Sequence, residues 1–187
     1  PYRIDQLREK GIETDLALTG FMKLDHLFQE NKIDGDSLIH KFNLDTSKKT
    51  ILFAPTFYPS SFELIAAKLG DYTNDHNLLI KPHLWTTFMN KFAGINHKKQ
   101  RELFNRIADS FDHVHLIPPE MYNITPFYKI SDLLITEASS TIYEMLAMDK
   151  PILVNRFYKL KLSHRLFKKR LYRARLNEQM EKEISEF

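Results

Sequence analysis

The chain has no cysteine, few glycines and no long apolar run. Without cysteine, its 187 residues form no disulfide and offer no thiolate to a metal. The five glycines form neither the GxGxxG nor the Walker pattern of phosphate-binding loops. No apolar run approaches the roughly 20 residues of a membrane-spanning helix, and the first residues do not resemble a signal peptide. Disulfide scaffolds, helical membrane spans and glycine-rich nucleotide loops are therefore excluded as explanations of this sequence.

Two further kinds of site lack the residues they need. His113 and His115 alternate along an apolar run, but no carboxylate or third histidine stands at the spacing of a zinc site. Ser139 and Ser140 lack the flanking glycines of a nucleophile elbow. We therefore expect no metal, no bound cofactor and no serine nucleophile.

The composition fits one ordinary domain. An apolar content of 43% supports a real core in a chain of this length. The sequence begins with proline rather than methionine, and we expect it to be part of a longer protein. Its net charge of +3 is modest but unevenly distributed, because nine lysines and arginines and no acid lie between Arg156 and Arg175.

Short apolar runs alternate with helical patterns along the middle of the chain. The runs begin near Ile51, Leu78, Val114, Leu133 and Ile152. They are apolar throughout rather than alternating, which is typical of strands buried on both faces of a parallel sheet. Helices are expected from a capping box at 60–63 through residue 69, over about 97–109, and after the Thr-Pro pair at 125–126. The pattern predicts an α/β fold with a doubly wound, mainly parallel sheet.

The two ends of the chain differ from this middle part, residues 46–160, which forms the predicted α/β domain. Residues 1–45 read as a lead-in or interdomain segment, with a short β-like run from Leu16, a glycine turn and a helical segment from Leu24 to Glu30. Residues 161–187 are predicted to form one long basic helix. The leucines at 162, 166, 171 and 176 recur near the helical period there.

Hydroxyl groups gather where a strand is predicted to meet a helix. Ser139, Ser140 and Thr141 follow the apolar run at 132–136 and precede a helical pattern. In an open α/β sheet, phosphorylated ligands bind at this position, beyond the carboxyl end of a strand, and the helix dipole favours an anion there. The alternative is that a serine is merely the N-cap of the helix.

A cation and an imidazole follow the second predicted strand. Lys81 and His83 should lie at the same edge of the sheet as the serines, because the carboxyl ends of parallel strands meet there. Charge neutralisation together with directional donors is what a pyrophosphate group needs from its site. For His83 the alternative is a surface loop histidine, one of eight histidines in the chain.

Three other residues have two interpretations each. Thr56 ends the first strand, where it offers a hydroxyl to the same edge or simply caps the strand. Glu144, about one turn into the helix, accepts hydrogen bonds from a ribose or is a solvent-exposed helix carboxylate. Glu137 orients the turn or repels an anion. The sequence leaves these alternatives open.

The basic run from Arg156 to Arg175 also carries apolar residues. It fits an amphipathic helix on an anionic membrane surface or against an acidic polymer. The alternative is a helix whose apolar side packs on this domain or on another one, with its charges in water.

Several stretches, taken in order, carry a resemblance to a known family. They lie at 18–25, 51–57, 81–83, 131–140, 143–144 and 150–152. Together they resemble the CDP-glycerol glycerophosphotransferases, teichoic-acid-type polymerases of the two-domain glycosyltransferase-B architecture, over about residues 16–155. The chain departs from the family pattern at Pro82-His83, where the family usually has His-Pro, and at Glu137-Ala138, where it usually has Asp-Tyr.

The resemblance implies that this chain is the C-terminal, Rossmann-like half that binds the donor. His83 would contact the donor phosphates, and Ser139 and Ser140 would hold the pyrophosphate. The implied donor is CDP-glycerol, with CDP-ribitol or a UDP-sugar left open, and the implied acceptor is a cell-surface polymer. In the family the general base belongs to the N-terminal half, so this chain alone is expected to be inactive.

Other functions stay open at this point. A UDP-sugar glycosyltransferase, half of a nucleotide-sugar epimerase and a non-catalytic basic docking module fit parts of the same pattern. No nucleic acid partner is expected. The expected location is the cytoplasm, on the inner face of the cell membrane if the run from Arg156 to Arg175 binds lipid.

Overall fold

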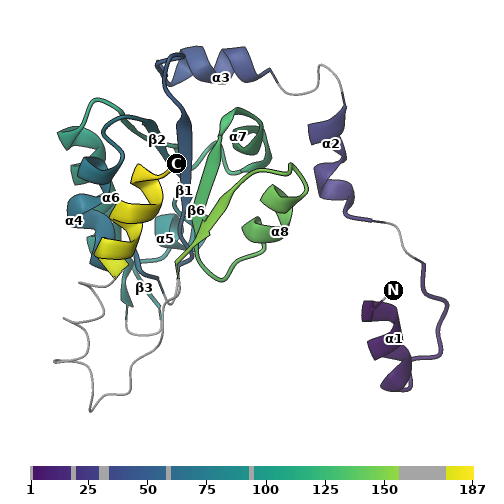
Figure 1. The fold of residues 1–187 in the computed structure, drawn as a ribbon. Coiled ribbons are helices and arrows are strands. Elements are labelled where there is room, and N and C mark those ends of the chain that lie inside the picture. Colours follow the sequence, from purple (N-terminus) through teal and green to yellow (C-terminus); the bar gives the residue numbers. More distant parts are fainter. Residues whose placement is uncertain (1, 18–19, 30–33, 58–59, 93–94, 156–175) are drawn as a thin grey trace.

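Five parallel strands form the sheet at the centre of the molecule. The computed structural model describes residues 2–17, 20–29, 34–57, 60–92, 95–155 and 176–187. The strands follow the order β5-β2-β1-β6-β7, and every pair is parallel (Figure 1). They are β1 (Thr50–Ala54), β2 (Asn77–Ile80), β5 (Val114–Leu116), β6 (Leu133–Thr136) and β7 (Ile152–Val154). Each strand lies where the sequence predicts it, and the doubly wound α/β fold is confirmed.

Helices connect these strands on both faces of the sheet. In chain order they are α4 (Phe62–Tyr72), α5 (Leu84–Phe88), α6 (His97–Ser110), α7 (Thr125–Ile130) and α8 (Thr141–Leu146). The helices expected near residues 97 and 125 are confirmed, and α7 has its proline in the first turn. A small antiparallel pair, β3 (Lys91–Phe92) with β4 (Ile95–Asn96), was not predicted, because strands of two residues carry no recognisable pattern.

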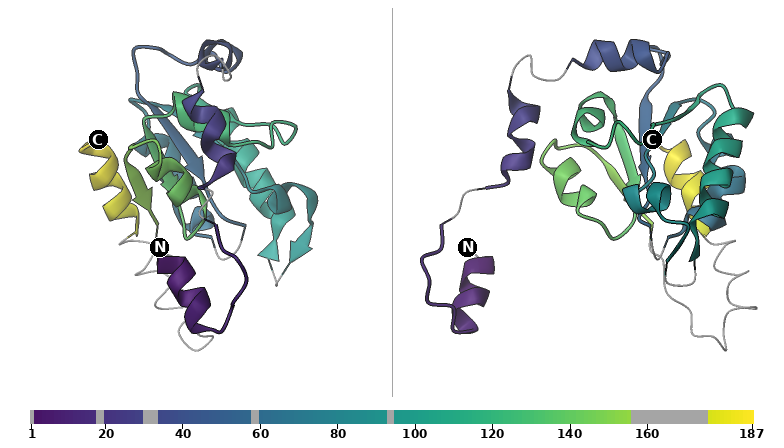
Figure 2. Two further views of the ribbon diagram at one scale, coloured as in Figure 1. Left: turned by 90° about the vertical axis from the view of Figure 1, so that its right-hand side faces the viewer. Right: turned by 180° about the vertical axis from the view of Figure 1, so that it is seen from behind.

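Alternate residues of each strand contribute to two separate cores. From β1, Ile51 and Phe53 join the core that α4 and α6 cover, whereas Leu52 and Ala54 join the core that α7 and α8 cover. Figure 2 shows helices on both sides of the sheet. Burial on both faces explains why the strands are apolar throughout. Because all the pairs are parallel, the carboxyl ends of the strands lie at one edge of the sheet.

Short helices of the N-terminal segment pack on the second of these cores. They are η1 (Met22–Leu24), α2 (Asp25–Phe28) and α3 (Gly35–Lys41). Leu24, Leu27 and Leu38 are buried in the same core as Leu52 and Met145. This part of the predicted lead-in therefore lies against the α/β domain.

The rest of the lead-in differs from expectation in detail. No strand forms at Leu16 and Ala17, and residues 18–19 lie outside the described residues. The helical segment expected from Leu24 to Glu30 is a 3₁₀ turn followed by one helical turn that ends at Phe28. Helix α1 (Tyr2–Glu9) lies apart from the sheet (Figure 1).

Residues 176–185 form a C-terminal helix that packs on the first core. Leu176, Met180 and Ile184 are buried at a spacing of four residues, which places them on one helix face. Asn177 fixes the helix to α4, since its amide accepts the Tyr72 hydroxyl at 3.2 Å and donates to the Leu64 carbonyl at 3.3 Å. The remainder of the predicted long helix, and the whole basic run at 156–175, lie outside the described residues.

Candidate functional site

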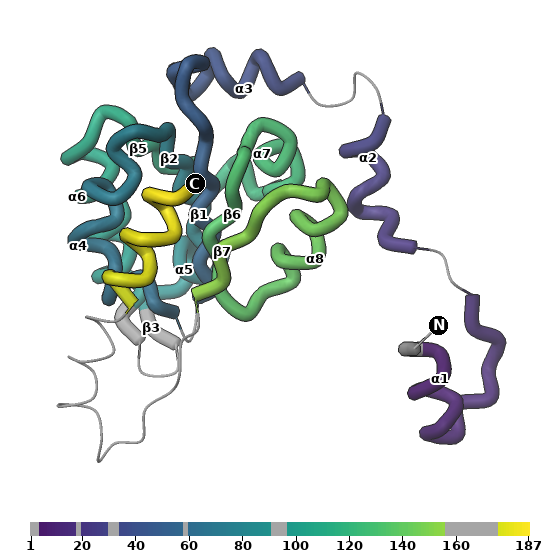
Figure 3. The backbone as a smooth tube through the Cα atoms, in the orientation of Figure 1, coloured from purple at the N-terminus to yellow at the C-terminus, as the bar shows by residue number. Residues whose placement is uncertain are grey.

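The sheet has a topological switch point between β1 and β6. These neighbouring strands pair from Ile51 opposite Leu133 to Ala54 opposite Thr136. The chain leaves β1 for α4 on one face and leaves β6 for α8 on the other (Figure 3). In open α/β sheets, ligands bind in the crevice that this divergence creates at the carboxyl edge.

Glu137, the residue after β6, joins the two strand ends at this crevice. Its side chain is 2% exposed. One carboxylate oxygen accepts the Thr56 N–H at 2.8 Å, and the other accepts the N–H and hydroxyl of Ser61 and the hydroxyl of Ser60. Burial raises the pKa of Glu137, and these donors act in the opposite sense. Of its two interpretations, the contacts support the one in which Glu137 orients the turn.

The same contacts replace the capping box expected at the start of α4. Ser61 is the N-cap residue, but its hydroxyl donates to Glu137 at 2.6 Å and makes no cap bond. Ser60 Oγ accepts the Phe62 N–H at 3.1 Å, while Glu63 is exposed. The expected capping box is therefore wrong, because Ser61 rather than Ser60 is the N-cap residue and both serine hydroxyls donate to the buried carboxylate of Glu137.

Ser139 and Ser140 lie in the turn between β6 and α8, and Thr141 is the first residue of α8, as predicted. The Thr141 hydroxyl lies 2.9 Å from that of Thr136, which itself donates to a β1 carbonyl, so Thr141 is the donor. Ser140 is the N-cap of α8 without a side-chain cap bond, and its hydroxyl donates to Glu144 over a long 3.4 Å. Ser139 Oγ accepts the Thr141 N–H at 3.4 Å. Both serine hydroxyls are thus held weakly enough for a ligand to engage them.

His83 lies at the carboxyl end of β2 as the N-cap of α5. Its Nδ1 accepts the Trp85 N–H at 3.2 Å, so the neutral ring carries its proton on Nε2. Burial lowers the pKa of His83, and the positive charges of Lys81 and His97 lower it further. Protonation of Nδ1 would also break the cap bond. Near neutral pH the ring is therefore a neutral hydrogen-bond donor at Nε2.

Lys81, two residues before His83, is a lysine with a largely buried side chain. Its side chain is 6% exposed, and within the described parts of the chain its ammonium has no hydrogen bond or ion pair. Burial lowers the pKa of Lys81, as expected for a desolvated charge. The ammonium of Lys150, by contrast, donates to three carbonyl oxygens at 2.7–2.9 Å. A partly desolvated ammonium that is unpaired within the described residues is a ready partner for an anion at this edge.

Phe57 connects the two sides of this edge. The centroid of its ring lies 4.9 Å from that of His83 and 4.8 Å from that of Trp85. Phe57 directly follows Thr56, whose N–H reaches Glu137 beside the serine turn. The residues predicted at the ends of β2, β1 and β6 therefore share one edge of the sheet. Their part in binding a donor stays a prediction.

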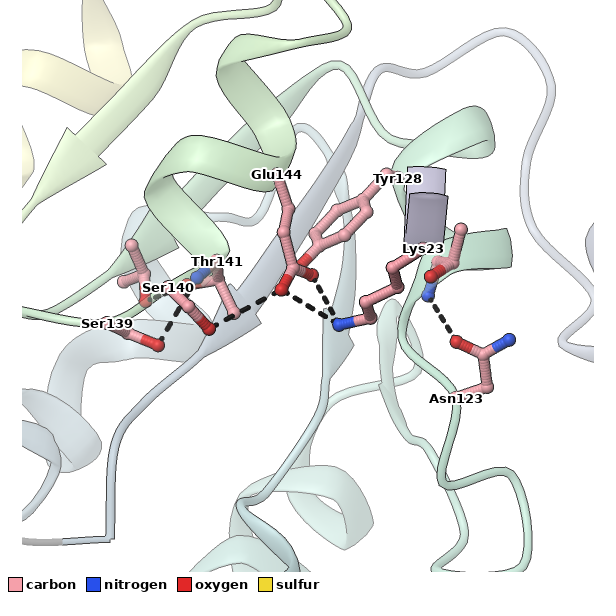
Figure 4. A network of polar contacts seen from close by, with 9 residues as sticks. Lys23, Asn123, Tyr128, Ser139, Ser140, Thr141 and Glu144 are labelled. Carbon is pink, nitrogen blue, oxygen red and sulfur yellow. Dashed lines mark hydrogen bonds and ion pairs between the residues drawn. The ribbon is translucent and has the colours of Figure 1, made fainter. Parts of the chain in front are cut away.

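Glu144 lies in a polar network at the same end of α8 (Figure 4). Its side chain is 2% exposed, so the alternative of a solvent-exposed carboxylate is wrong. Both carboxylate oxygens accept from Lys23 Nζ at 2.8 Å, and Oε2 also accepts the Tyr128 hydroxyl at 2.9 Å. Burial and the neighbouring carboxylate raise the pKa of Tyr128, so Tyr128 is a permanent donor. The role of Glu144 in ribose binding stays a prediction.

The sequence did not identify Lys23 or Tyr128 as parts of this edge. Lys23 and Glu144 are 121 residues apart, and no local pattern joins them. The available signal was that Lys23 stands within the stretch at 18–25 that resembles the family.

Three further observations concern metal and membrane. No three histidine, cysteine, aspartate or glutamate side chains gather as a metal site in the described residues. Within the same residues, no helix is both long and apolar enough to cross a membrane. The basic run at 156–175, to which the expected membrane contact belongs, lies outside them.

Comparison with known proteins decides the family. A family model described as CDP-Glycerol:Poly(glycerophosphate) glycerophosphotransferase matches residues 10–162. The chain belongs to this family. Membership confirms the resemblance drawn from the stretches between residues 18 and 152 and places the chain among the glycerophosphotransferases, a class of transferases.

Individual members of the family and their structures are similar to this chain. The teichoic acid glycerol-phosphate primase of Bacillus spizizenii is 28% identical over 144 residues, which are 76% of this chain and 34% of the primase. One structure of the wall teichoic acid polymerase TagF, a variant soaked with CDPG for 30 minutes, matches with a TM-score of 0.50 at 19% identity over 98% of this chain and 48% of that one. Another, after a 15 minute soak, matches with a TM-score of 0.48 at 18% identity over 89% and 42%. The chain thus spans about a third of the primase and less than half of these TagF chains. The likeness to the structure with a TM-score of 0.50 shows the fold.

Proposed function

We propose that this chain is the donor-binding part of a transferase that moves glycerol phosphate from CDP-glycerol to a cell-surface polymer. Family membership supports the reaction class. The single observation that supports the donor site is Lys81, a largely buried lysine that is unpaired within the described residues and close enough to His83 to lower its pKa at the carboxyl edge. The proposal places the protein in the cytoplasm, with any membrane contact left to the basic run at 156–175.

The charges at this edge suit a pyrophosphate. Lys81 is partly desolvated, and an anion that pairs with it relieves part of a cost that the free protein bears. His83 adds a directional donor, and the hydroxyls of Ser139 and Ser140 add two more without further charge. Helix α8 has six residues, so these side chains rather than a helix dipole supply the attraction.

The reaction that we propose is the one implied by the resemblance to the family. An acceptor hydroxyl oxygen attacks the β-phosphorus of CDP-glycerol and forms a new P–O bond. The bond from that phosphorus to the bridging oxygen breaks, and CMP leaves with the electron pair. Negative charge grows on the bridging oxygen, where Lys81 and His83 stabilise it. A general base takes the acceptor proton, and by resemblance to the family we propose that it belongs to an N-terminal half outside this chain.

Calorimetric titration of the chain with CDP-glycerol, CDP, UDP and UDP-N-acetylglucosamine tests the proposed donor. We expect cytidine-selective binding that His83→Asn weakens by about tenfold or more, since the loss of one charge-assisted hydrogen bond costs about 1.5–3 kcal/mol. Asparagine still caps α5, so the fold is retained. His76→Asn is the matched control, because His76 precedes β2 at the opposite edge. Uridine selectivity would contradict the proposed donor, and no binding of any nucleotide would contradict the proposed site.

Donor binding should also depend on pH through His83. An anion beside the ring raises the pKa of His83 from its lowered value in the free protein. Binding is then coupled to proton uptake, so the affinity for CDP-glycerol should rise as the pH falls from about 8 to about 6. The pyrophosphate diester itself does not titrate in this range. In the same titration with His83→Asn, the affinity should not change with pH. An affinity of the unchanged chain that decreases as the pH is lowered from about 8 to about 6 would contradict the role of His83.

A further inference from the structure

Lys23 and Glu144 form a half-buried ion pair that links the N-terminal segment to α8 (Figure 4). The ammonium of Lys23 contacts both carboxylate oxygens at 2.8 Å. The Lys23 side chain is 45% exposed, whereas that of Glu144 is 2% exposed. Leu24 and Leu27, which follow Lys23, are buried in the core beneath α8 and hold the lysine in place.

The negative charge of Glu144 is unfavourable beside a phosphate-binding site. Its Oε1 lies 3.4 Å from Ser140 Oγ, one of the hydroxyls proposed to hold the donor pyrophosphate. A buried carboxylate this close repels an anion at the serine turn, because little water screens the two charges. Tyr128 donates a hydrogen bond but no charge. Within the described residues, Lys23 is the cation that contacts Glu144.

We propose that Lys23 is a positioning residue of the donor site, which neutralises Glu144 so that a nucleoside diphosphate can bind at the Ser139–Ser140 turn. This inference rests on the proposed function. Lys23 acts through Glu144, and it supplies to the donor edge a charge carried by the segment that precedes the α/β domain.

The acceptor positions of the Glu144 carboxylate are all occupied. A carboxylate has about four acceptor positions, and Lys23 with two contacts, Tyr128 and Ser140 occupy them. The long bond from Ser140 is the weakest of these. A donor that engages Ser140 therefore displaces the weakest bond and leaves the ion pair intact, so the compensation persists in the complex.

A double-mutant cycle of Lys23 and Glu144, with CDP as the ligand, tests the inference. Lys23→Met should weaken CDP binding by about tenfold or more, because it leaves an uncompensated carboxylate a few ångström from the diphosphate. Glu144→Gln supplies the second background of the cycle. The double variant Lys23→Met with Glu144→Gln should bind CDP within about threefold of Glu144→Gln alone, since no uncompensated carboxylate remains. Lys23→Arg should bind normally.

The outcomes separate this inference from the proposed function. If the unchanged chain binds no CDP, the proposed site fails, and the role of Lys23 fails with it. If the unchanged chain binds CDP and Lys23→Met binds equally well, the role of Lys23 alone is overturned. A double variant that binds CDP no better than Lys23→Met does would also overturn the role of Lys23. In that case the ion pair acts only as a structural contact, which is lost in the single and the double variant alike. Melting temperatures of all four variants check that the fold is retained.

Discussion

Replacement of Lys81 by methionine is expected to remove donor binding and at the same time to stabilise the fold. Methionine fills a similar volume without a charge, so the cost of the desolvated ammonium disappears, and we expect the free energy of unfolding to rise by about 1 kcal/mol. The donor loses its buried partner, and the affinity for CDP-glycerol should fall by about 100-fold. Urea denaturation and calorimetric titration measure the two effects.

Lys150→Met is the matched control for this variant. Burial lowers the pKa of Lys150 as it does that of Lys81, but three carbonyl oxygens satisfy the ammonium of Lys150. Its replacement should therefore destabilise the chain and leave nucleotide binding unchanged. A gain in stability for Lys81→Met and a loss for Lys150→Met would identify Lys81 as a residue that serves ligand binding rather than stability. A Lys81→Met chain that is less stable and still binds the donor would show that Lys81 is structural.

Glu137→Ala is expected to have the largest effect on stability. It leaves the Thr56 N–H and the N–H and hydroxyl of Ser61 buried without their acceptor. Each such loss costs about 1–3 kcal/mol, and partial relaxation should leave a total near 3 kcal/mol. The ends of β1 and β6 would no longer be joined, so CDP-glycerol binding should weaken as well.

Two further variants locate the effect of Glu137. Glu137→Asp keeps the carboxylate and should retain more than half of the lost stability. Asp132→Ala is the control at the amino edge, where Asp132 Oδ2 accepts the Thr50 N–H at 2.7 Å and joins the same two strands. It should lower stability without a change in affinity. Equal losses of affinity in Asp132→Ala and Glu137→Ala would contradict a local role of Glu137 at the donor edge.

The strands and their direction could be predicted from the sequence because the signal is local. The residues of β1, for example, are apolar throughout, as burial on both faces requires. The start of α7 was visible in its Thr-Pro pair. By contrast, the start of α4 was misread, because the hydroxyl of Ser61 serves Glu137, a residue 76 positions away.

The location of the candidate site could be predicted from the sequence, but the contacts between its side chains could not. The rule that the carboxyl ends of parallel strands share an edge brought Lys81, His83 and the serine turn together. It said nothing about which side chains are already engaged there. That Glu137 joins β1 to β6 and that Lys23 pairs with Glu144 depends on packing between distant segments, which no local spacing encodes.

A crystal structure of the chain with CDP-glycerol would test the central claim most directly. We expect the pyrophosphate at the carboxyl edge of β1, β2 and β6, with its oxygens within hydrogen-bond distance of Lys81 Nζ, His83 Nε2 and the hydroxyl of Ser139 or Ser140. The Lys23–Glu144 ion pair should remain closed beside it. A donor bound elsewhere on the chain, with Lys81 still buried and unpaired, would contradict the account.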